Sequence, residues 1–293
     1  MREDLDISED VDALREEMES NFADLSEEQQ AKANEFYEAV LSTPLFQGGD
    51  LVKQSNALTD AAYRLSINGK RVLWLCLADL VRKGVKEDNT LQTSFRLSAR
   101  IFRKHFGGSY DNSCRDLAAG IASLKNDGGV QFSSKTGAIK AWVPWLVGET
   151  SIFENTPKAE HILLFSPGIV KKIIALEKEY TRFQLTEVGK ISNAKHARLY
   201  EKCRQWVRAG GFKIHKDELA DLCDLAVTFR SNSSALQKRF LDPAISRLEK
   251  ATSLKISYAK NGDFYRFTVT DTAKIEKANT DGLPSEPEGE GEE

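Results

Sequence analysis

The sequence has no closely spaced pair of cysteines and no long apolar run. Its four cysteines, Cys76, Cys114, Cys203 and Cys223, form no CxxC pair, so we expect buried thiols and neither a disulfide framework nor a zinc finger. No apolar stretch approaches the ~18 residues that a membrane-spanning helix needs, and the N-terminus is acidic where a secretory signal is cationic. These absences favour a soluble, cytoplasmic protein without a membrane partner.

Patterns for binding nucleotides and catalytic metals are also missing. Gly69-Lys70 and Gly189-Lys190 lack both the upstream glycine and the following Ser or Thr of the GxxxxGK[ST] loop. Cleavage of a phosphodiester by a tyrosine nucleophile needs a metal held by a His-hydrophobic-His pair. No two of the four histidines, His105, His161, His196 and His215, lie within two residues of each other. We therefore expect a protein that is not an enzyme, with no catalytic residue, cofactor or metal.

The formal net charge of -3 conceals an uneven distribution along the chain. Residues 1–50 contain 15 acidic and 3 basic side chains, and residues 277–293 contain 6 and 1, so residues 51–276 carry a formal charge of about +14. Lysine and arginine displace counterions from phosphates, and acidic ends can weaken nonspecific binding. A polyanionic partner is the functional interpretation of this pattern. A solvated cationic surface is the alternative.

The two ends of the chain differ from its body. Apolar residues recur at helical spacing between Val11 and Leu25, and Ser26-Glu27-Glu28-Gln29 has the form of a capping box ahead of a second apolar set, Phe36, Tyr37, Val40 and Leu41. Residues 1–50 are therefore predicted to form an acidic helical arm, which either binds a partner or folds back on the body. Residues 273–293, which end in "DGLPSEPEGEGEE", are too polar to bury a core and are predicted to be a disordered acidic tail.

One order of elements occurs twice between these ends. In the first copy, Ser98 caps a short helix that ends at Phe106, a second helix covers about 114–124, and the strands "VQFSS" and "IKAWVPW" follow. In the second copy, helices cover about 217–224 and 235–250, and "LKISYAKNGDFYRFTVT" predicts a hairpin around Asn261-Gly262. Helix, turn, helix and hairpin is the order of a winged helix.

The predicted fold class is therefore α+β, with two tandem winged-helix domains between the acidic arm and the acidic tail. The domains are expected at residues 51–182 and 183–272. An amphipathic helix that begins at Ser166-Pro167 is predicted to join them, with a buried stripe of Ile169, Ile173, Leu176 and Tyr180.

The segment "LQKRFLDPAISRLEK", residues 236–250, is a candidate DNA-reading helix. Its apolar positions, which would face a core, are Leu236, Phe240, Ala244, Ile245 and Leu248. In a helix-turn-helix unit the second helix lies in the major groove, where the planar arginine fork can bind a guanine edge or a phosphate. An ordinary surface helix with solvated cations is the alternative. The candidate DNA-binding residues are Lys238, Arg239, Arg247 and Lys250, with Arg230, Ser233 and Ser234 ahead of the helix.

Pro243 lies inside this predicted helix. A proline there removes one backbone hydrogen bond and clashes with the preceding turn. Two outcomes are open: either the helix kinks, or Asp242 caps a new helix that starts at Pro243.

Four stretches in order resemble the iteron-binding family of plasmid replication initiators. They are "LVKQSNALTDAAYRLSINGKRVLWLCLADL", "FSPGIVKKI", "SNAKHARLYEKCRQW" and "LQKRFLDPAISRLEKATSLKISY", and the resemblance covers about residues 50–270. It implies two winged-helix domains, of which the second reads directly repeated origin sites while the first adds phosphate contacts and a dimer interface. It also implies that monomers act in replication with host initiator and helicase proteins, whereas dimers bind an inverted repeat and repress the protein's own gene.

Carried over to this chain, the resemblance assigns groove or phosphate contacts to the 236–250 helix. It gives Lys195, His196 and Arg198 a role in positioning the DNA backbone, and leaves Tyr200 to the core. The family's "EQR" is replaced here by Asn68-Gly69-Lys70-Arg71, so the resemblance does not define the start of that helix. A tandem winged-helix repressor without a replication role is the second interpretation, and a nicking enzyme is the third.

Overall fold

The computed structural model describes residues 26–31, 42–61, 63–83, 94–126, 129–133, 140–152, 159–174 and 180–273. The chain divides into two compact units, Met1–Pro44 and Leu45–Glu293. In the first unit a short helix covers residues 27–31. The Gln29 N–H donates to Ser26 Oγ (3.4 Å) and the Ser26 N–H donates to Gln29 Oε1 (3.1 Å), which confirms the predicted capping box. The apolar positions on either side of it, and the acidic tail after Ala273, lie outside the described residues.

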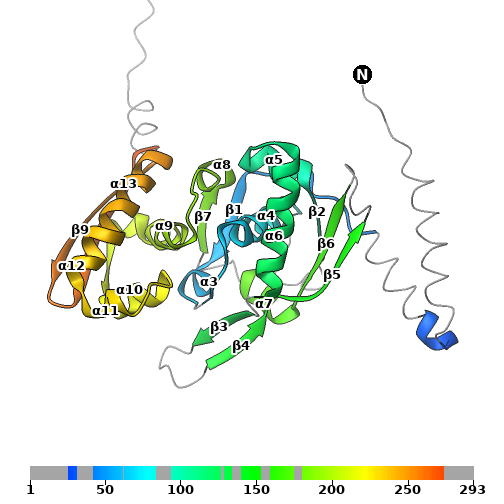
Figure 1. Ribbon diagram of the computed structural model, residues 1–293, viewed down its shortest axis with the longest axis horizontal. Helices are drawn as coiled ribbons and strands as arrows, with labels where there is room; N and C mark the ends of the chain where they lie inside the picture. Colours follow the sequence, from blue (N-terminus) through cyan, green and yellow to red (C-terminus); the bar gives the residue numbers. More distant parts are fainter. Residues whose placement is uncertain are drawn as a thin grey trace, which may run out of the picture. The chain divides into compact units, whose positions relative to one another are not determined.

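The first region of the second unit, up to residue 184, is built around one buried helix. Eleven of the 17 residues of α4 (Ile67–Lys83) are buried, and α4 packs beside α6 (Figure 1). The other elements are β1 (Leu51–Ser55), α3 (Asn56–Asp60), β2 (Ser94–Ser98), α5 (Ala99–Phe106), α6 (Tyr110–Asn126), β3 (Gly129–Ser133), β4 (Lys140–Pro144), β5 (Leu146–Ile152), β6 (Glu160–Phe165), α7 (Pro167–Ile174) and β7 (Tyr180–Gln184).

The predicted first copy of helix, turn, helix and hairpin is present in this region. Ser98 Oγ accepts from the Ile101 N–H and caps α5, the turn at Gly107 and Gly108 has positive φ, and α6 follows. Strands β3 and β4 pair antiparallel as the expected hairpin, and a separate three-stranded sheet has the order β2-β6-β5. The first region thus has the element order of a winged helix with added strands.

The predicted helix from Ser166 to Tyr180 is correct at its start and wrong at Tyr180, and residues 175–179, with Leu176, lie outside the described residues. Ser166 Oγ accepts from the Ile169 N–H, and Ile169 and Val170 are fully buried in α7. Tyr180, however, belongs to β7, which pairs antiparallel with β1. The residues of β7 alternate between buried Thr181 or Phe183 and exposed neighbours, so the period-two pairing with β1 overrides the helical pattern there. The expected domain boundary at 182/183 falls inside this strand.

The second region, residues 185–273, contains the second copy. Its elements are α8 (Leu185–Val188), α9 (Ala194–Trp206), η2 (Val207–Ala209), β8 (Gly211–His215), α10 (Lys216–Leu222), α11 (Thr228–Ser231), α12 (Ser233–Ala235), η3 (Leu236–Leu241), α13 (Asp242–Ala251), β9 (Leu254–Asn261) and β10 (Phe264–Asp271). The sheet order is β8-β10-β9, and Figure 1 shows α13 beside β9.

The hairpin of this copy confirms its sequence pattern. Asn261 pairs with Phe264, so Gly262 and Asp263 form the two-residue turn, and Gly262 takes the positive φ of 60° that such turns require. Ile256, Tyr265, Phe267 and Val269 point inward and are buried. No helix of the described residues is long and apolar enough to cross a membrane.

A buried ionic cluster joins the two regions. Both carboxylate oxygens of Glu201 on α9 accept from Lys70 Nζ of α4 at 2.9 Å, and Arg198 Nη1 (3.2 Å), Trp74 Nε1 (3.1 Å) and the Tyr63 hydroxyl (3.5 Å) also donate to it. Lys70, Arg198 and Glu201 are each at most 3% exposed. We call these five side chains the Glu201 cluster. Because α4 and α9 each supply part of it, Glu201 is one of the groups that hold the two regions together.

Candidate nucleic-acid interface

The second helix of the second copy has the predicted inward and outward faces. Its inward residues are buried, namely Leu236, Phe240, Leu241, Ala244 and Leu248, and Ile245 packs against them. The side chains of Lys238, Arg239, Arg247 and Lys250 are exposed. None of these four has a carboxylate partner among the residues that the structure describes. The helix therefore presents a cationic outer face to solvent.

Pro243 is accommodated by a π-helical turn, which neither sequence alternative included. The turn covers η3, and the Asp242 N–H donates to the Gln237 carbonyl five residues earlier. The wider turn relieves the crowding that a proline causes in a regular helix, where its ring meets the carbonyl four residues back. Asp242 has helical backbone angles (φ -60°, ψ -48°), and its carboxylate accepts from the Tyr258 hydroxyl at 2.7 Å. The prediction that Asp242 caps a new helix is therefore wrong.

A hollow of about 360 Å³ lies between the C-terminal half of α13 and the start of α9. We call it the α13 hollow, and its lining is Lys190, Ile191, Ser192, His196, Arg247, Leu248, Lys250 and Ala251. Three of these side chains are permanent cations, one is a hydroxyl, and no carboxylate is among the described residues that line it. This chemistry suits a phosphate group, which accepts hydrogen bonds and carries negative charge.

His196 forms part of the wall of this hollow. Its ring centroid lies 6.0 Å from that of Phe240, and only 8% of the residue is exposed. Burial and the nearby Arg247 guanidinium lower the pKa of His196, which favours the neutral ring at pH 7. The Asn193 side chain caps α9 by accepting from the Lys195 and His196 N–H groups. The expected contact residue His196 is thus a wall residue rather than a free cation.

The remaining predicted site residues have different surroundings. Lys195 is exposed, and its Nζ donates to the Asp224 carbonyl at 2.7 Å. Arg230 forms an ion pair with Asp221. Ser234 is exposed and Ser233 is half-buried at the start of α12. These four side chains lie at or near the surface of the second region but do not line the α13 hollow.

Arg198 requires a correction. Its guanidinium is buried, donates to the Ala61 carbonyl (2.7 Å), the Leu222 carbonyl (3.0 Å) and Glu201, and lies 4.2 Å from the centre of the Tyr63 ring. A side chain with these contacts cannot reach a DNA backbone without leaving the Glu201 cluster. The expected positioning role of Arg198 toward DNA is therefore not supported, and its contacts are those of a residue that joins the two regions.

The first region offers cations on the corresponding helix-turn-helix. Arg100, Arg103 and Lys104 on α5 and Arg115 on α6 are exposed. Arg103 Nε donates to the Gly108 carbonyl at 3.2 Å, which holds this side chain against the turn between the helices. Arg96 differs from the others because it forms a 2.5 Å ion pair with Glu160 across two sheet strands.

Two residues of the α13 hollow were missed by the sequence analysis. In the sequence patterns Lys190 appears only beside Gly189, and Ser192 appears only as the first residue of the stretch "SNAKHARLYEKCRQW". The available signal was their position just ahead of the Asn193 cap, because residues that precede a helix N-terminus lie near its free N–H groups.

The two copies of helix, turn, helix and hairpin define a winged-helix protein. A family model described as "Initiator Replication protein, WH1" matches residues 51–204, more than half of the chain. This chain belongs to that family of replication initiators.

This chain is also similar to two other proteins. An uncharacterised 27.6 kDa protein of Escherichia coli is 29% identical over 229 residues, which is 75% of this chain and 94% of that protein. The crystal structure of the Pi initiator protein in complex with iteron DNA has a TM-score of 0.61 to this chain at 17% identity. The match covers 75% of this chain and 97% of that one, and it shows a shared fold.

Proposed function

We propose that this protein initiates plasmid replication by binding directly repeated sites in double-stranded origin DNA. The observation that carries the proposal is the outer face of η3 and α13, where Lys238, Arg239, Arg247 and Lys250 are exposed beside a hollow whose described lining has no carboxylate. Family membership and the fold shared with an initiator solved on iteron DNA support it.

In the proposed mechanism, phosphate contacts and base contacts come from different parts of one helix. Arg247 and Lys250, with Lys190, bind a phosphate in the α13 hollow and set the register of the protein on the duplex. Lys238 and Arg239, which do not line the hollow, reach base edges in the major groove. The first region adds phosphate contacts through the cations of α5 and α6.

Origin opening then follows from binding energy. Monomers bound along neighbouring repeats bend the DNA, and flexible AT-rich steps yield at the lowest cost. Host helicase is loaded by contact with the bound protein. Dimers formed through the first winged-helix domain bind an inverted repeat in the protein's own promoter and repress it.

Footprinting on the DNA that flanks the protein's own gene tests this function. We expect several protected direct repeats of about 20 base pairs, close to two helical turns each, beside an AT-rich tract. Protection of a single palindrome and of no direct repeat would contradict the initiator function and favour the repressor.

Single substitutions on the second helix should separate base reading from phosphate binding. Arg239→Ala should cost about 1–3 kcal/mol of binding free energy and relax specificity at one base position. Arg247→Ala should weaken binding equally on repeat and random duplexes and lower the salt slope by about one. Fluorescence anisotropy with both duplexes measures these effects, and Arg64→Ala, whose side chain is 80% exposed beside Asp224, is the control. If Arg239→Ala loses the same binding free energy on the repeat duplex and on the random duplex, Arg239 does not contact a base.

A further inference from the structure

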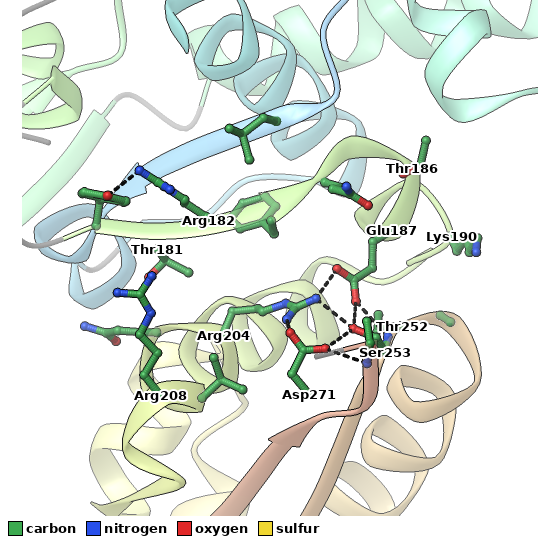
Figure 2. A pocket seen from close by; sticks show the side chains of 18 of the residues that line it. Thr181, Arg182, Thr186, Glu187, Lys190, Arg204, Arg208, Thr252, Ser253 and Asp271 are labelled. Carbon is green, nitrogen blue, oxygen red and sulfur yellow. Dashed lines mark hydrogen bonds and ion pairs between the residues drawn. The ribbon is translucent and has the colours of Figure 1, made fainter. Parts of the chain in front are cut away.

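A second and larger cleft lies beside the C-terminal end of α13. It has a volume of about 680 Å³ and is bounded by β7, α8, α9 and the end of α13 (Figure 2). The end of the β9–β10 hairpin opposite its turn, where β9 begins and β10 ends, also lines the cleft. We call it the Arg204 cleft after the side chain at its floor. Its charged lining consists of five cations and two carboxylates, namely Arg182, Lys190, Arg204, Arg208, Lys250, Glu187 and Asp271.

The two carboxylates of the cleft are both paired with Arg204 at its floor. Arg204 donates to Glu187 Oε2 at 2.5 Å and to Asp271 Oδ2 at 2.6 Å. The Ser253 N–H donates to Glu187 Oε1 and the Ser253 hydroxyl donates to Asp271 Oδ1, both at 2.8 Å. Figure 2 shows this network. Burial alone would raise the pKa of Asp271, but the hydrogen bonds from Ser253 and Arg204 hold it below its ordinary value.

The four remaining cations are exposed around this floor. Arg182 donates to the Tyr180 hydroxyl at 2.5 Å, and none of Arg182, Lys190, Arg208 and Lys250 pairs with a carboxylate in the described part of the chain. The cleft as a whole is therefore positively charged and open to an anionic ligand. Lys190 and Lys250 also line the α13 hollow, so an anion bound in the cleft would engage two of the proposed phosphate-binding cations.

The sequence supplies an anionic segment at the edge of the cleft. Ala273 follows the hairpin and is itself part of the cleft lining. Residues 274–293 contain seven acidic and two basic side chains, and both basic ones precede Asp281. Eight residues can span up to roughly 26 Å, so a segment that starts at Asp281 can reach the cleft from Ala273. Such a short tether gives an effective concentration on the order of millimolar.

We propose that the acidic segment 281–293 binds in the Arg204 cleft and competes with DNA for Lys190 and Lys250, the two cations that the cleft shares with the α13 hollow. Its carboxylates pair with Arg182 and Arg208 and engage Lys190 and Lys250 in place of phosphates. Competition with DNA rests on the proposed function, whereas occupancy of the cleft by the segment does not. Because DNA of any sequence needs these phosphate-binding cations in the proposed mechanism, the segment lowers the affinity for random and repeat duplexes alike.

Neutralising charges on the acidic segment or on the cleft cations Arg182 and Arg208 should in both cases strengthen nonspecific DNA binding. In the full-length chain, replacing Glu286, Glu288, Glu290, Glu292 and Glu293 with Gln should strengthen binding to random duplex DNA by roughly 2- to 10-fold, as expected for loss of a weak tethered competitor. The double variant Arg182→Gln/Arg208→Gln should also bind more tightly, although it has lost two cations. Lys255→Gln/Lys260→Gln, whose exposed side chains lie on the hairpin outside the cleft lining, is the matched control and should not bind more tightly. Weaker binding by the Arg182/Arg208 variant would overturn the proposal, because it would place DNA in the cleft.

Cross-linking without DNA tests occupancy independently of the DNA-binding function. Carbodiimide treatment of the wild-type protein, followed by mass spectrometry, should join Lys190 or Lys250 to carboxylates of residues 281–293. A synthetic peptide of residues 281–293 should bind the Gln-substituted protein weakly, and salt should abolish that binding. Absence of these cross-links together with no peptide binding would overturn the proposal even if the protein binds origin repeats.

Discussion

Raising the salt concentration from 50 to 200 mM should weaken DNA binding by about 10³- to 10⁵-fold, as expected for roughly 6 to 10 phosphate contacts. The expectation follows from the body of the chain, which carries a formal charge of about +14. Exposed cations on α5, α6 and α13, with Lys190, provide enough contacts for this number. Anisotropy titrations of a labelled duplex at several salt concentrations measure the slope of log affinity against log salt.

Thermal unfolding at the same salt concentrations is the control for this measurement. The midpoint should change little across the range, because ion pairs such as those of Glu201 are buried and weakly screened. A flat binding response in a folded protein would show that the positive body is only solvated. It would remove the phosphate contacts on which the proposed function depends.

Replacing Glu201 with Ala should lower the free energy of unfolding by about 3–5 kcal/mol, because it leaves two buried cations, Lys70 and Arg198, without their anion. This is a large part of the ~5–15 kcal/mol that stabilises an ordinary domain. Chemical unfolding followed by circular dichroism measures the change. Asp60→Ala is the matched control, since Asp60 pairs with Lys202 near the surface and such pairs contribute ~0.2–1 kcal/mol.

The pH dependence of this difference identifies the carboxylate as its source. Burial would raise the pKa of Glu201, but Lys70 and Arg198 hold it below its ordinary value. The stabilisation should therefore be complete above the pKa of an unfolded glutamate, about 4.3, and should be lost as the pH falls through the lower folded value. If the difference in free energy of unfolding between the wild type and Glu201→Ala does not change in acid, the loss comes from packing and not from the carboxylate charge.

The elements of the second winged helix were predictable because each has a local signal. Alternation from Ile256 to Val269 around a two-residue turn defines the hairpin, and the apolar stripe from Leu236 to Leu248 defines the face of the preceding helix. The π turn at Pro243 could not be predicted from local sequence patterns. The sequence shows that proline removes one backbone hydrogen bond from the helix, but it does not show which backbone conformation results. The β7 strand was missed because its partner, β1, lies about 130 residues earlier.

The candidate site was predictable for the exposed cations and not for the buried ones. Lys238, Arg239, Arg247 and Lys250 face solvent as a helical stripe requires. Arg198 and Lys70 carry the same charge, but their burial depends on Glu201, which lies 131 residues from Lys70. No spacing rule connects Lys70 with Glu201, and the i,i+3 spacing of Arg198 and Glu201 does not show that this pair is buried.

The pairing of β1 with β7 has a consequence for how the chain is made. Leu51–Ser55 leaves the ribosome early, but its strand partner Tyr180–Gln184 and the anion of Lys70 emerge well over a hundred residues later. Until then the nascent first region has an open strand edge and an unpaired internal lysine, and both favour misassembly. A gene fragment cut at residue 182 would make that temporary state permanent, so expression of the first winged helix alone should extend at least through Trp206, the end of α9.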